Sequence, residues 1–267
     1  MAHGDVDDEV KRAGEAKAEA VRHMFSSIAP RYDLLNHVLS ANIDRRWRRR
    51  AVARLLEGRD PRGRFLDACA GTLDLAVEIS RARGFTGRIA AVDFALPMLL
   101  HGAGKVAERP IFPVCGDALR LPFGDSTFDG ATVGFGIRNV AGLDEGLAEL
   151  ARVLKPGGRL VILEFATPTW RPLRAAYMFY FLRVLPAIGR WVSRHGSAYE
   201  YLPRSVLAFP APDALAERIG AAGFTHVRWE ALTGGIAALH IAERVGDQNG
   251  VADVRDRATG RGRAAGA

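Results

Sequence analysis

The chain has 267 residues, of which 48% are hydrophobic and 25% charged, so it is long enough for one α/β domain and too apolar to be disordered throughout. Its two cysteines exclude a disulfide scaffold and a four-thiolate zinc site; we expect no bound metal, and both Cys69 and Cys115 to be buried free thiols. The net charge of +7 allows an anionic partner, nucleic acid or lipid, without choosing between them.

Both ends of the chain are polar. Residues 1–20 lack the apolar run of a secretory signal, and we expect them to form a polar helical arm. Residues 246–267 contain few side chains that could enter a core, which predicts a disordered tail. Because no run of about 18 apolar residues exists, we predict no transmembrane helix. We expect a single domain over residues 21–245. The two free thiols suit a reducing compartment, so we expect a cytoplasmic protein.

Between these ends, apolar runs alternate with segments of helical periodicity. The pattern predicts strands at 65–70, 88–94, 111–118, 128–135 and 159–165, and helices at 73–83, 96–108, 143–154 and 213–224. KPGG at 155–158 is typical of a turn, and TGG at 233–235 separates two last strands, THVRWEAL and ALHIAER. The alternation predicts an α/β fold with a doubly wound, mostly parallel sheet and an antiparallel hairpin at its C-terminal edge.

Four polar features follow strands of this sheet, at the edge where such sheets bind ligands. They are the segment Asp67–Asp74 with Gly71 in its loop, Asp93, Asp117, and the segment Gly134–Asn139. No GxGxxG motif is present, so the backbone cradle for a pyrophosphate is missing. A carboxylate at Asp93 suits a ribose diol and one at Asp117 suits the adenine amine, which points to S-adenosylmethionine. The alternative is that these acids only cap helices.

Several longer motifs resemble the ubiquinone/menaquinone-biosynthesis C-methyltransferase family, a class I S-adenosylmethionine-dependent group with a Rossmann-like fold. The resemblance covers roughly residues 20–245 and rests on FSSIAPRYDLLNHVLSANIDRRWRRRAV (25–52), LDACAGTLDLA (66–76), GDALRLPFGDSTFD (116–129), GFGIRNV (134–140), ARVLKPGGRLVILEF (151–165) and LTGGIAALHIAER (232–244). The first block, GFGIRNV and LTGGIAALHI are the most specific of these and point to the quinone branch.

The resemblance implies roles for individual positions. Thr72 is expected beside the methionine end of the cofactor, Asp93 at the ribose, Asp117 and Ala118 beside the adenine, and Gly134 in contact with the cofactor. The resemblance also implies a polyprenyl quinol as the acceptor, most specifically demethylmenaquinol.

Two positions depart from the family pattern. Leu73 stands where the family loop carries glycine, and its Cβ is expected to crowd the cofactor or to force another backbone angle. Gly134 stands where relatives carry serine, which removes one side-chain hydrogen bond.

Residues 170–200 form the most apolar and aromatic part of the chain, interrupted by Pro172, Pro186 and several arginines. We expect this segment to cover the lipophilic substrate and to contact the inner face of the membrane transiently, through side chains such as Phe179 and Phe181. The arginines within residues 45–50 would add attraction to anionic lipid. The alternatives are a core helix for the first segment and a solvated helix face for the second.

Methylation of a ring carbon requires the quinol hydroxyl to lose its proton, so the site needs a base or donors that stabilise a phenolate. Arg138 and Asn139 follow the fourth strand at the cofactor edge and are the first candidates for this role. Tyr201 and His240 are secondary candidates, and a packing or hydrogen-bonding role suits each of them better.

Three functions therefore compete. The first is an enzyme that methylates demethylmenaquinol or the matching benzoquinol, and the second is a relative that acts on another phenol or a small lipophile. The third is an S-adenosylmethionine-binding regulator without turnover, which Leu73 favours. A nucleic-acid partner is not expected, because the chain lacks an aromatic-basic loop for base flipping. A homo-oligomer is left open.

Overall fold

The computed structural model describes residues 16, 18–29, 40, 42–184 and 197–246. Most of the predicted N-terminal arm, at 1–15 and 17, lies outside the described residues, as does the tail at 247–267. The described part of the N-terminal region, residues 18–29, is helical.

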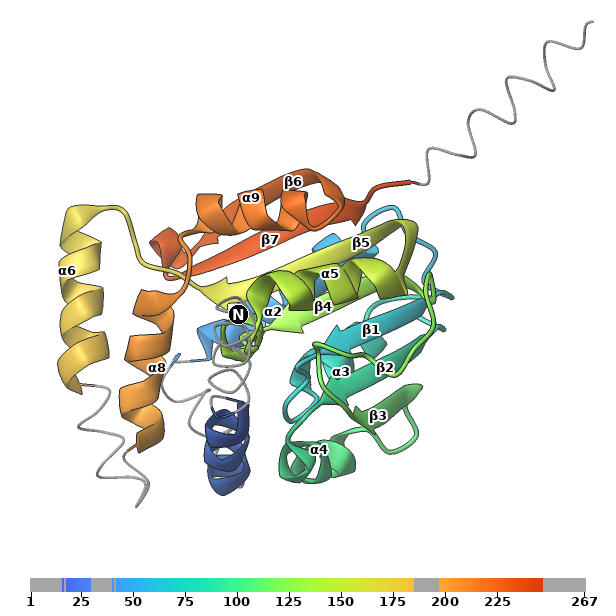
Figure 1. Cartoon of the computed structure of the whole chain (residues 1–267), viewed down its shortest axis with the longest axis horizontal. Helices are drawn as coiled ribbons and strands as arrows, with labels where there is room; N and C mark the ends of the chain where they lie inside the picture. The colour runs from blue at the N-terminus through green and yellow to red at the C-terminus, as the bar shows by residue number, and fades with distance from the viewer. Residues whose placement is uncertain (1–15, 17, 30–39, 41, 185–196, 247–267) are drawn as a thin grey trace, which may run out of the picture.

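Seven strands form one twisted sheet in the order β3-β2-β1-β4-β5-β7-β6 (Figure 1). Their bounds are β1 Arg64–Ala68, β2 Arg88–Asp93, β3 Ile111–Cys115, β4 Phe128–Gly134, β5 Leu154–Phe165, β6 Phe224–Leu232 and β7 Ala237–Arg244. The first five strands pair in parallel, whereas β7 runs antiparallel between β5 and β6. The predicted parallel sheet with an antiparallel C-terminal hairpin is therefore confirmed.

Helices cover both faces of the sheet. Their bounds are α2 Ile43–Leu56, α3 Asp74–Ser80, α4 Leu96–Gly102, α5 Leu143–Val153, α6 Arg171–Phe179, α8 Ser197–Ala208 and α9 Pro212–Ala221. Side chains of α2, α3 and α4 pack on one face in a core that contains Phe65 of β1. Side chains of α5 and α9 pack on the other face with the next residue, Leu66. Because successive strand residues point to opposite faces, both faces of these central strands are apolar, as a doubly wound sheet requires.

Helices α6 and α8 stand beside each other at the end of the sheet where β5 finishes (Figure 1). Tyr177 of α6, Phe181 of the π-helical turn Tyr180–Val184 and Val206 of α8 form a small separate core there. The rings of Tyr177 and Phe181 stack with centroids 4.9 Å apart. Part of the predicted segment 170–200, residues 185–196, lies outside the described residues.

Some predicted boundaries are wrong for local reasons. The helix predicted at 73–83 spans Asp74–Ser80, because Leu73 has a φ of 71° and cannot belong to a right-handed helix. The helix predicted at 96–108 ends at Gly102, and a 3₁₀ turn, Ala103–Lys105, follows it. The KPGG residues lie within β5, where the pairing with β4 jumps from Leu154 to Arg159 and forms a bulge.

The two cysteines are free, as predicted, but their burial differs from the prediction. Cys115 is exposed, and Cys69 is half-buried at the end of β1. Cys115 ends β3, which is the outermost strand of the sheet, and so lacks a strand on its outer side.

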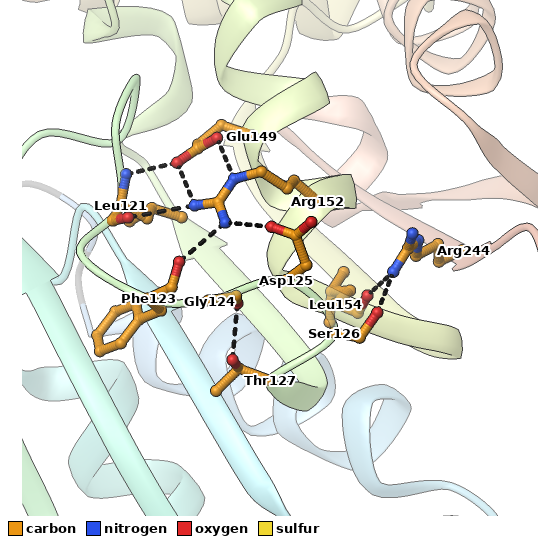
Figure 2. A network of polar contacts seen from close by, with 10 residues as sticks. All are labelled: Leu121, Phe123, Gly124, Asp125, Ser126, Thr127, Glu149, Arg152, Leu154 and Arg244. Atoms are coloured by element: carbon orange, nitrogen blue, oxygen red, sulfur yellow. Dashed lines mark hydrogen bonds and ion pairs between the residues drawn. The ribbon is translucent and has the colours of Figure 1, made fainter.

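The long loop between β3 and β4 is held by one arginine of α5 (Figure 2). Arg152 donates to the carbonyl oxygens of Leu121 and Phe123, at 3.2 and 2.8 Å, and to the Asp125 carboxylate at 2.7 Å. Glu149 accepts two bonds from the same guanidinium and one from the Leu121 amide, at 2.6 Å. This network fixes the loop that carries Asp117 and Ala118 at its start.

Candidate functional site: a cofactor cleft at the carboxyl edge of the sheet

An open cleft lies at the carboxyl ends of the central strands. Six of the predicted site residues line it: Gly71, Asp93, Asp117, Ala118, Gly134 and Asn139. Five others, namely Asp67, Thr72, Arg138, Tyr201 and His240, are not among its lining residues. The parallel register explains the grouping, because strand ends far apart in the chain meet at this edge.

Asp93 ends β2 and points into the turn that follows β1. Its Oδ2 accepts a hydrogen bond from the Gly71 amide at 2.8 Å, and its Oδ1 accepts one from the Ala95 amide at 2.9 Å. Each oxygen keeps a further lone pair, so the carboxylate can still accept the two hydroxyl protons of a ribose. Burial raises the pKa of Asp93, and the two amides oppose that shift.

Asp117 begins the loop held by Arg152. Its Oδ1 accepts from the Leu119 amide at 2.9 Å, which folds residues 117–119 into a tight turn. Gly116, Asp117, Ala118 and Leu119 together form one wall of the cleft. This is the wall at which the sequence places the adenine.

Asp67 and Thr72 lie beneath the cofactor loop and are buried, with 1% and 2% of their surfaces exposed. Asp67 accepts from the Ala76 amide at 3.0 Å and from the Thr132 hydroxyl at 2.9 Å. It therefore ties the first turn of α3 to β1 and β4, which supports the loop from below. Burial raises the pKa of Asp67 to about 7.

The raised pKa of Asp67 predicts a pH effect on stability. The folded chain holds this proton up to about pH 7, whereas the unfolded chain releases it near the ordinary value of 3.8, so unfolding becomes easier as the pH rises between these values. Asp67→Asn removes the titration and can keep both hydrogen bonds. Denaturant unfolding should show that, between pH 5 and pH 8, the free energy of unfolding of the native chain falls by about 2 kcal/mol more than that of the variant. An equal change in the free energy of unfolding of both proteins between the two pH values would contradict the effect of Asp67.

Three non-glycine residues at this edge adopt the left-handed region: Cys69 at φ 54°, Leu73 at 71° and Phe135 at 58°. Such conformations are costly for residues with a Cβ and cluster at functional sites. The Leu73 side chain is fully buried in the core beneath the sheet edge and does not line the cleft. Leu73 thus adopts the left-handed angle that glycine favours, and its side chain points away from the cleft.

The glycines after β4 are explained by close packing. A Cβ on Gly136 would lie 2.3 Å from the Cβ of Cys69, so only glycine fits between the two turns. A Cβ on Gly134 would meet only the tip of Leu75, at 3.0 Å, so a small shift of Leu75 would admit the serine of relatives.

The helical segment 18–29 contributes Ala18 and Phe25 to the cleft, a role the sequence reading did not assign. Ala29 and Phe25 pack against Met98 of α4 and Phe94. The Arg22 guanidinium lies 5.7 Å from the centre of the Phe94 ring. The apolar spacing of Phe25 and Ala29, four residues apart, is the signal that could have revealed this contact.

Arg138 lies directly behind the cleft wall. Its Nη1 donates to the carbonyl oxygen of Phe135 at 2.6 Å and to Oε1 of Glu164, an ion pair whose two side chains are only 5% and 2% exposed. Its guanidinium also lies 5.4 Å from the centre of the Phe165 ring. The sequence gives no sign of a role for Glu164, because it is the penultimate residue of a strongly apolar strand and its partner Arg138 is distant in the sequence.

Asn139 connects the cleft to α8. Its Oδ1 accepts from the Tyr201 hydroxyl at 3.0 Å, and its side chain lines the cleft. The structure therefore brings Arg138, Asn139 and Tyr201, three of the candidates for the catalytic role, close together. Burial raises the pKa of Tyr201, and the charge of Arg138 opposes that shift.

His240 lies elsewhere, in the middle of β7 opposite Ile162. Its Nε2 is 2.9 Å from the carbonyl oxygen of Pro212, at the start of α9, and burial lowers its pKa. These contacts belong to packing between α9 and the sheet.

The charge of the cleft can be compared with the cofactor that the sequence implies. Among its described lining residues are two carboxylates, Asp93 and Asp117, and no lysine, arginine or histidine. Such a lining favours a cation and lacks the positive groups that bind phosphates. S-adenosylmethionine, a sulfonium with a ribose and an adenine and no phosphate, fits these residues.

Comparison with known proteins identifies the family of the chain. The model of the ubiE/COQ5 methyltransferase family matches residues 12–244. A demethylmenaquinone methyltransferase of Thermus thermophilus is 50% identical over 224 residues, which cover 83% of this chain and 100% of that protein. A ubiquinone/menaquinone biosynthesis C-methyltransferase of Geobacter sulfurreducens is 47% identical, covering 85% of this chain and 90% of that protein.

Solved structures show the same fold at low identity. A SAM-dependent methyltransferase of Thermotoga maritima superposes with a TM-score of 0.58 at 18% identity, over 83% of this chain and 99% of that one. The [4+2]-cyclase SpnF gives a TM-score of 0.62 at 18% identity, over 85% and 96%. The fold is that of class I methyltransferases, and S-adenosylmethionine is the cofactor. By its sequence over nearly its whole folded length, the chain belongs to the ubiE/COQ5 family of C-methyltransferases.

Proposed function

We propose that this enzyme methylates a ring carbon of a lipophilic quinol, demethylmenaquinol, in quinone biosynthesis. The observation that carries the proposal is Arg138, a buried cation bonded to the Phe135 carbonyl in the wall of the cofactor cleft. A fixed positive charge beside the methyl donor suits an acceptor that becomes an anion, as a quinol does. The names of relatives at 47–50% identity support the same acceptor.

S-adenosylmethionine, when bound, supplies an activated methyl group, so the chain has mainly to position the acceptor and to exclude water. In the proposed mechanism Asp93 holds the ribose, and the loop at Asp117 and Ala118 holds the adenine. Arg138 stabilises the phenolate, because its guanidinium keeps its charge at working pH and donates in a fixed plane. Asn139, held by Tyr201, orients the acceptor ring at the cleft.

A methyl-transfer assay tests the proposed acceptor. Purified protein with labelled S-adenosylmethionine should label a short-tailed demethylmenaquinol in a time-dependent reaction and should leave tRNA unlabelled. Label in the matching benzoquinol as well would widen the acceptor class without changing the chemistry. Cofactor binding without transfer to either quinol, while a different phenol is labelled, would contradict the proposed acceptor.

We further propose that the face of α6 and α8 docks on anionic membrane, where the tail of the acceptor resides. Four large apolar side chains are exposed there, Trp170, Phe179, Leu182 and Leu207, at 66%, 67%, 45% and 49%. Exposed arginines stand among them: Arg171, Arg174, Arg183 and Arg204. Apolar groups beside cations are typical of helices that lie on a membrane surface. Within the described residues, no helix is both long and apolar enough to cross a bilayer.

The structure changes the choice of side chains for this surface. Phe181 is 3% exposed and packs against Tyr177, so the expectation that it contacts the membrane together with Phe179 is wrong for Phe181. The π-helical turn after α6 rotates Phe181 into the small core between α6 and α8.

If this surface docks on the membrane, its exposed aromatic residues should matter for vesicle binding and for long-tailed substrates. Changing Trp170 and Phe179 to serine should weaken binding to anionic vesicles and raise KM for long-tailed quinols more than for short-tailed ones. Binding should also weaken with salt. Phe112→Ser is the matched control, because that side chain is 53% exposed on β3, the strand at the opposite edge of the sheet. An equal loss of vesicle binding in both variants would contradict the proposal that α6 and α8 form the docking surface.

A further inference from the structure

Three buried polar atoms without a hydrogen-bond partner among the described residues belong to one cluster beside the cofactor cleft. They are Nε of Arg138, Oε2 of Glu164 and the hydroxyl of Tyr177. The side chains of Arg138 and Glu164 are 5% and 2% exposed, and Tyr177 is 8% exposed. Folded proteins rarely leave such atoms unpaired, since each costs free energy in a dry interior. Three in one place indicate a site for a polar ligand atom.

The Glu164 carboxylate is held in one orientation. Its Oε1 accepts from Arg138 and from the Phe165 amide, the latter at 2.9 Å, and this leaves Oε2 open. The buried acids at the same sheet edge differ, because both oxygens of Asp67 and both oxygens of Asp93 already accept hydrogen bonds. Glu164 is therefore the buried carboxylate at this edge, within the described chain, that has an oxygen without a hydrogen-bond partner.

The cluster is next to the cleft. Gly134, in the cleft wall, pairs with Leu163 in the register of β4 and β5, so Glu164 follows one residue beyond that pair. Arg138 bonds the carbonyl of Phe135, and its neighbour Asn139 also lines the cleft. Tyr177 approaches from α6, the helix that carries the proposed docking surface. An acceptor ring that enters past Asn139 would bring its oxygen toward this cluster.

We propose that Arg138, Glu164 and Tyr177 form the subsite for the ring oxygen of the quinol, and that Glu164 accepts its proton. This inference rests on the proposed function and adds the base that the reaction requires. Arg138 faces the oxygen as it becomes an anion, and the Tyr177 hydroxyl donates to it.

The step balances in atoms and charge. The quinol O–H bond breaks and its proton moves to Oε2 of Glu164, which leaves a phenolate. The electron pair of the adjacent ring carbon then forms the bond to the methyl carbon as the carbon–sulfur bond breaks, and the products are a neutral dienone and the thioether. Transfer of the ring-carbon proton to the oxygen restores the quinol, and Glu164 releases its proton to solvent.

The surroundings of Glu164 suit a general base. Burial raises its pKa, and the charge of Arg138 opposes that shift. The other titratable groups that sense its charge are Tyr177 of α6, Tyr201 of α8 and Cys69 at the end of β1, each with a pKa that burial raises. All three stay neutral at working pH, so Arg138 dominates. A carboxyl with a raised pKa is a stronger base than an exposed one.

Glu164→Gln tests the base, with Glu243→Gln as its matched control. Glu243 pairs with Arg159, a mostly buried arginine, at 2.9 Å, and Arg159 lies five residues before Glu164 in β5, at the first pair of β5 with β7. With a short-tailed demethylmenaquinol, Glu164→Gln should lower kcat by about 10²–10⁴, the range of general-base catalysis, with cofactor Kd unchanged within about twofold. Glu243→Gln should keep kcat. In the native enzyme kcat should fall as the pH drops and Glu164 is protonated, and the variant should lack that limb.

A second acceptor separates a base from a structural support. A ring-halogenated demethylquinol has a more acidic hydroxyl and needs less help to ionise, so the defect of Glu164→Gln should shrink by about tenfold or more with it. An equal loss with both acceptors, or no loss with either, would overturn the assignment. Absence of transfer to any quinol by the native enzyme would instead refute the proposed function.

Tyr177→Phe tests the subsite if Glu164→Gln fails to fold. The change removes the unpaired hydroxyl and keeps the ring stacked on Phe181. It should raise KM for the quinol and lower kcat by about tenfold while thermal stability stays the same or rises, because a buried unpaired hydroxyl is lost. Tyr180→Phe, three residues along the same helical segment, should leave both constants unchanged. Unchanged constants in Tyr177→Phe would exclude that hydroxyl from the subsite.

Discussion

Arg138→Ala is expected to lower kcat by about 10²–10³, the cost of removing one donor from a developing anion in other enzymes. The same change should destabilise the fold by about 3–5 kcal/mol, because Glu164 would be left as an unpaired buried charge. Arg138→Lys keeps the charge and loses the planar fork, so it should lower kcat with less loss of stability. Steady-state kinetics, denaturant unfolding and calorimetric titration of the cofactor measure the three quantities separately.

A double variant separates catalysis from stability at this pair. Arg138→Met combined with Glu164→Leu replaces the ion pair with apolar side chains of similar size, which is often neutral or stabilising in a protein interior. It should therefore recover the stability lost in Arg138→Ala while methyl transfer stays low. A double variant that is stable and fully active would show that neither side chain takes part in the reaction.

Asp93→Ala should weaken cofactor binding by about 10²–10⁴-fold, since it removes two acceptors for the ribose diol, each hydrogen bond to a charged group contributing about 1.5–3 kcal/mol. The change also removes the acceptors for the amides of Gly71 and Ala95, so the cofactor loop loses its tie to β2. Calorimetric titration of S-adenosylmethionine measures the affinity, and circular dichroism shows whether the fold is kept.

Asp129→Ala provides the control for this loss. Asp129 likewise accepts a strand amide, that of Arg64 at 2.8 Å, but it lies near the start of β4, at the opposite end of that strand from the cleft. The two variants should lose comparable stability, and only Asp93→Ala should lose affinity. Native affinity in Asp93→Ala would mean that the ribose is held elsewhere.

The order of strands and helices could be predicted from the sequence because the sheet is buried on both faces. Such strands are continuous apolar runs, and the helices between them keep an apolar stripe, so each element carries its own signal. The residues at the cleft could be predicted for a related reason. Parallel strands all end at one edge, so Asp93, Asp117 and Gly134, which end or follow three of them, must meet there.

Local conformation limited the prediction where a residue departs from its usual backbone region. Leu73 adopts a left-handed angle and delays the start of α3, although its apolar side chain fits the helical pattern. The KPGG residues form a bulge within β5 because Leu154 still pairs with β4 before them. The pattern favours a helix at Leu73 and a turn at KPGG, and core packing and tertiary pairing override these local preferences.

The sequence alone determined the sheet, the family and the edge at which the candidate cofactor residues gather, since these follow from patterns within single segments. Only the tertiary structure decided which side chains form the proposed acceptor subsite. Arg138 and Glu164 are 26 residues apart and Tyr177 belongs to a third element, so nothing in their local sequence marks them as partners. Packing buries Asp67 beneath the cofactor loop and Phe181 in the small core between α6 and α8, and no local sequence pattern predicts either position. The role of a charged side chain in a buried strand depends on the partner that the tertiary fold places beside it, and the local sequence does not name that partner.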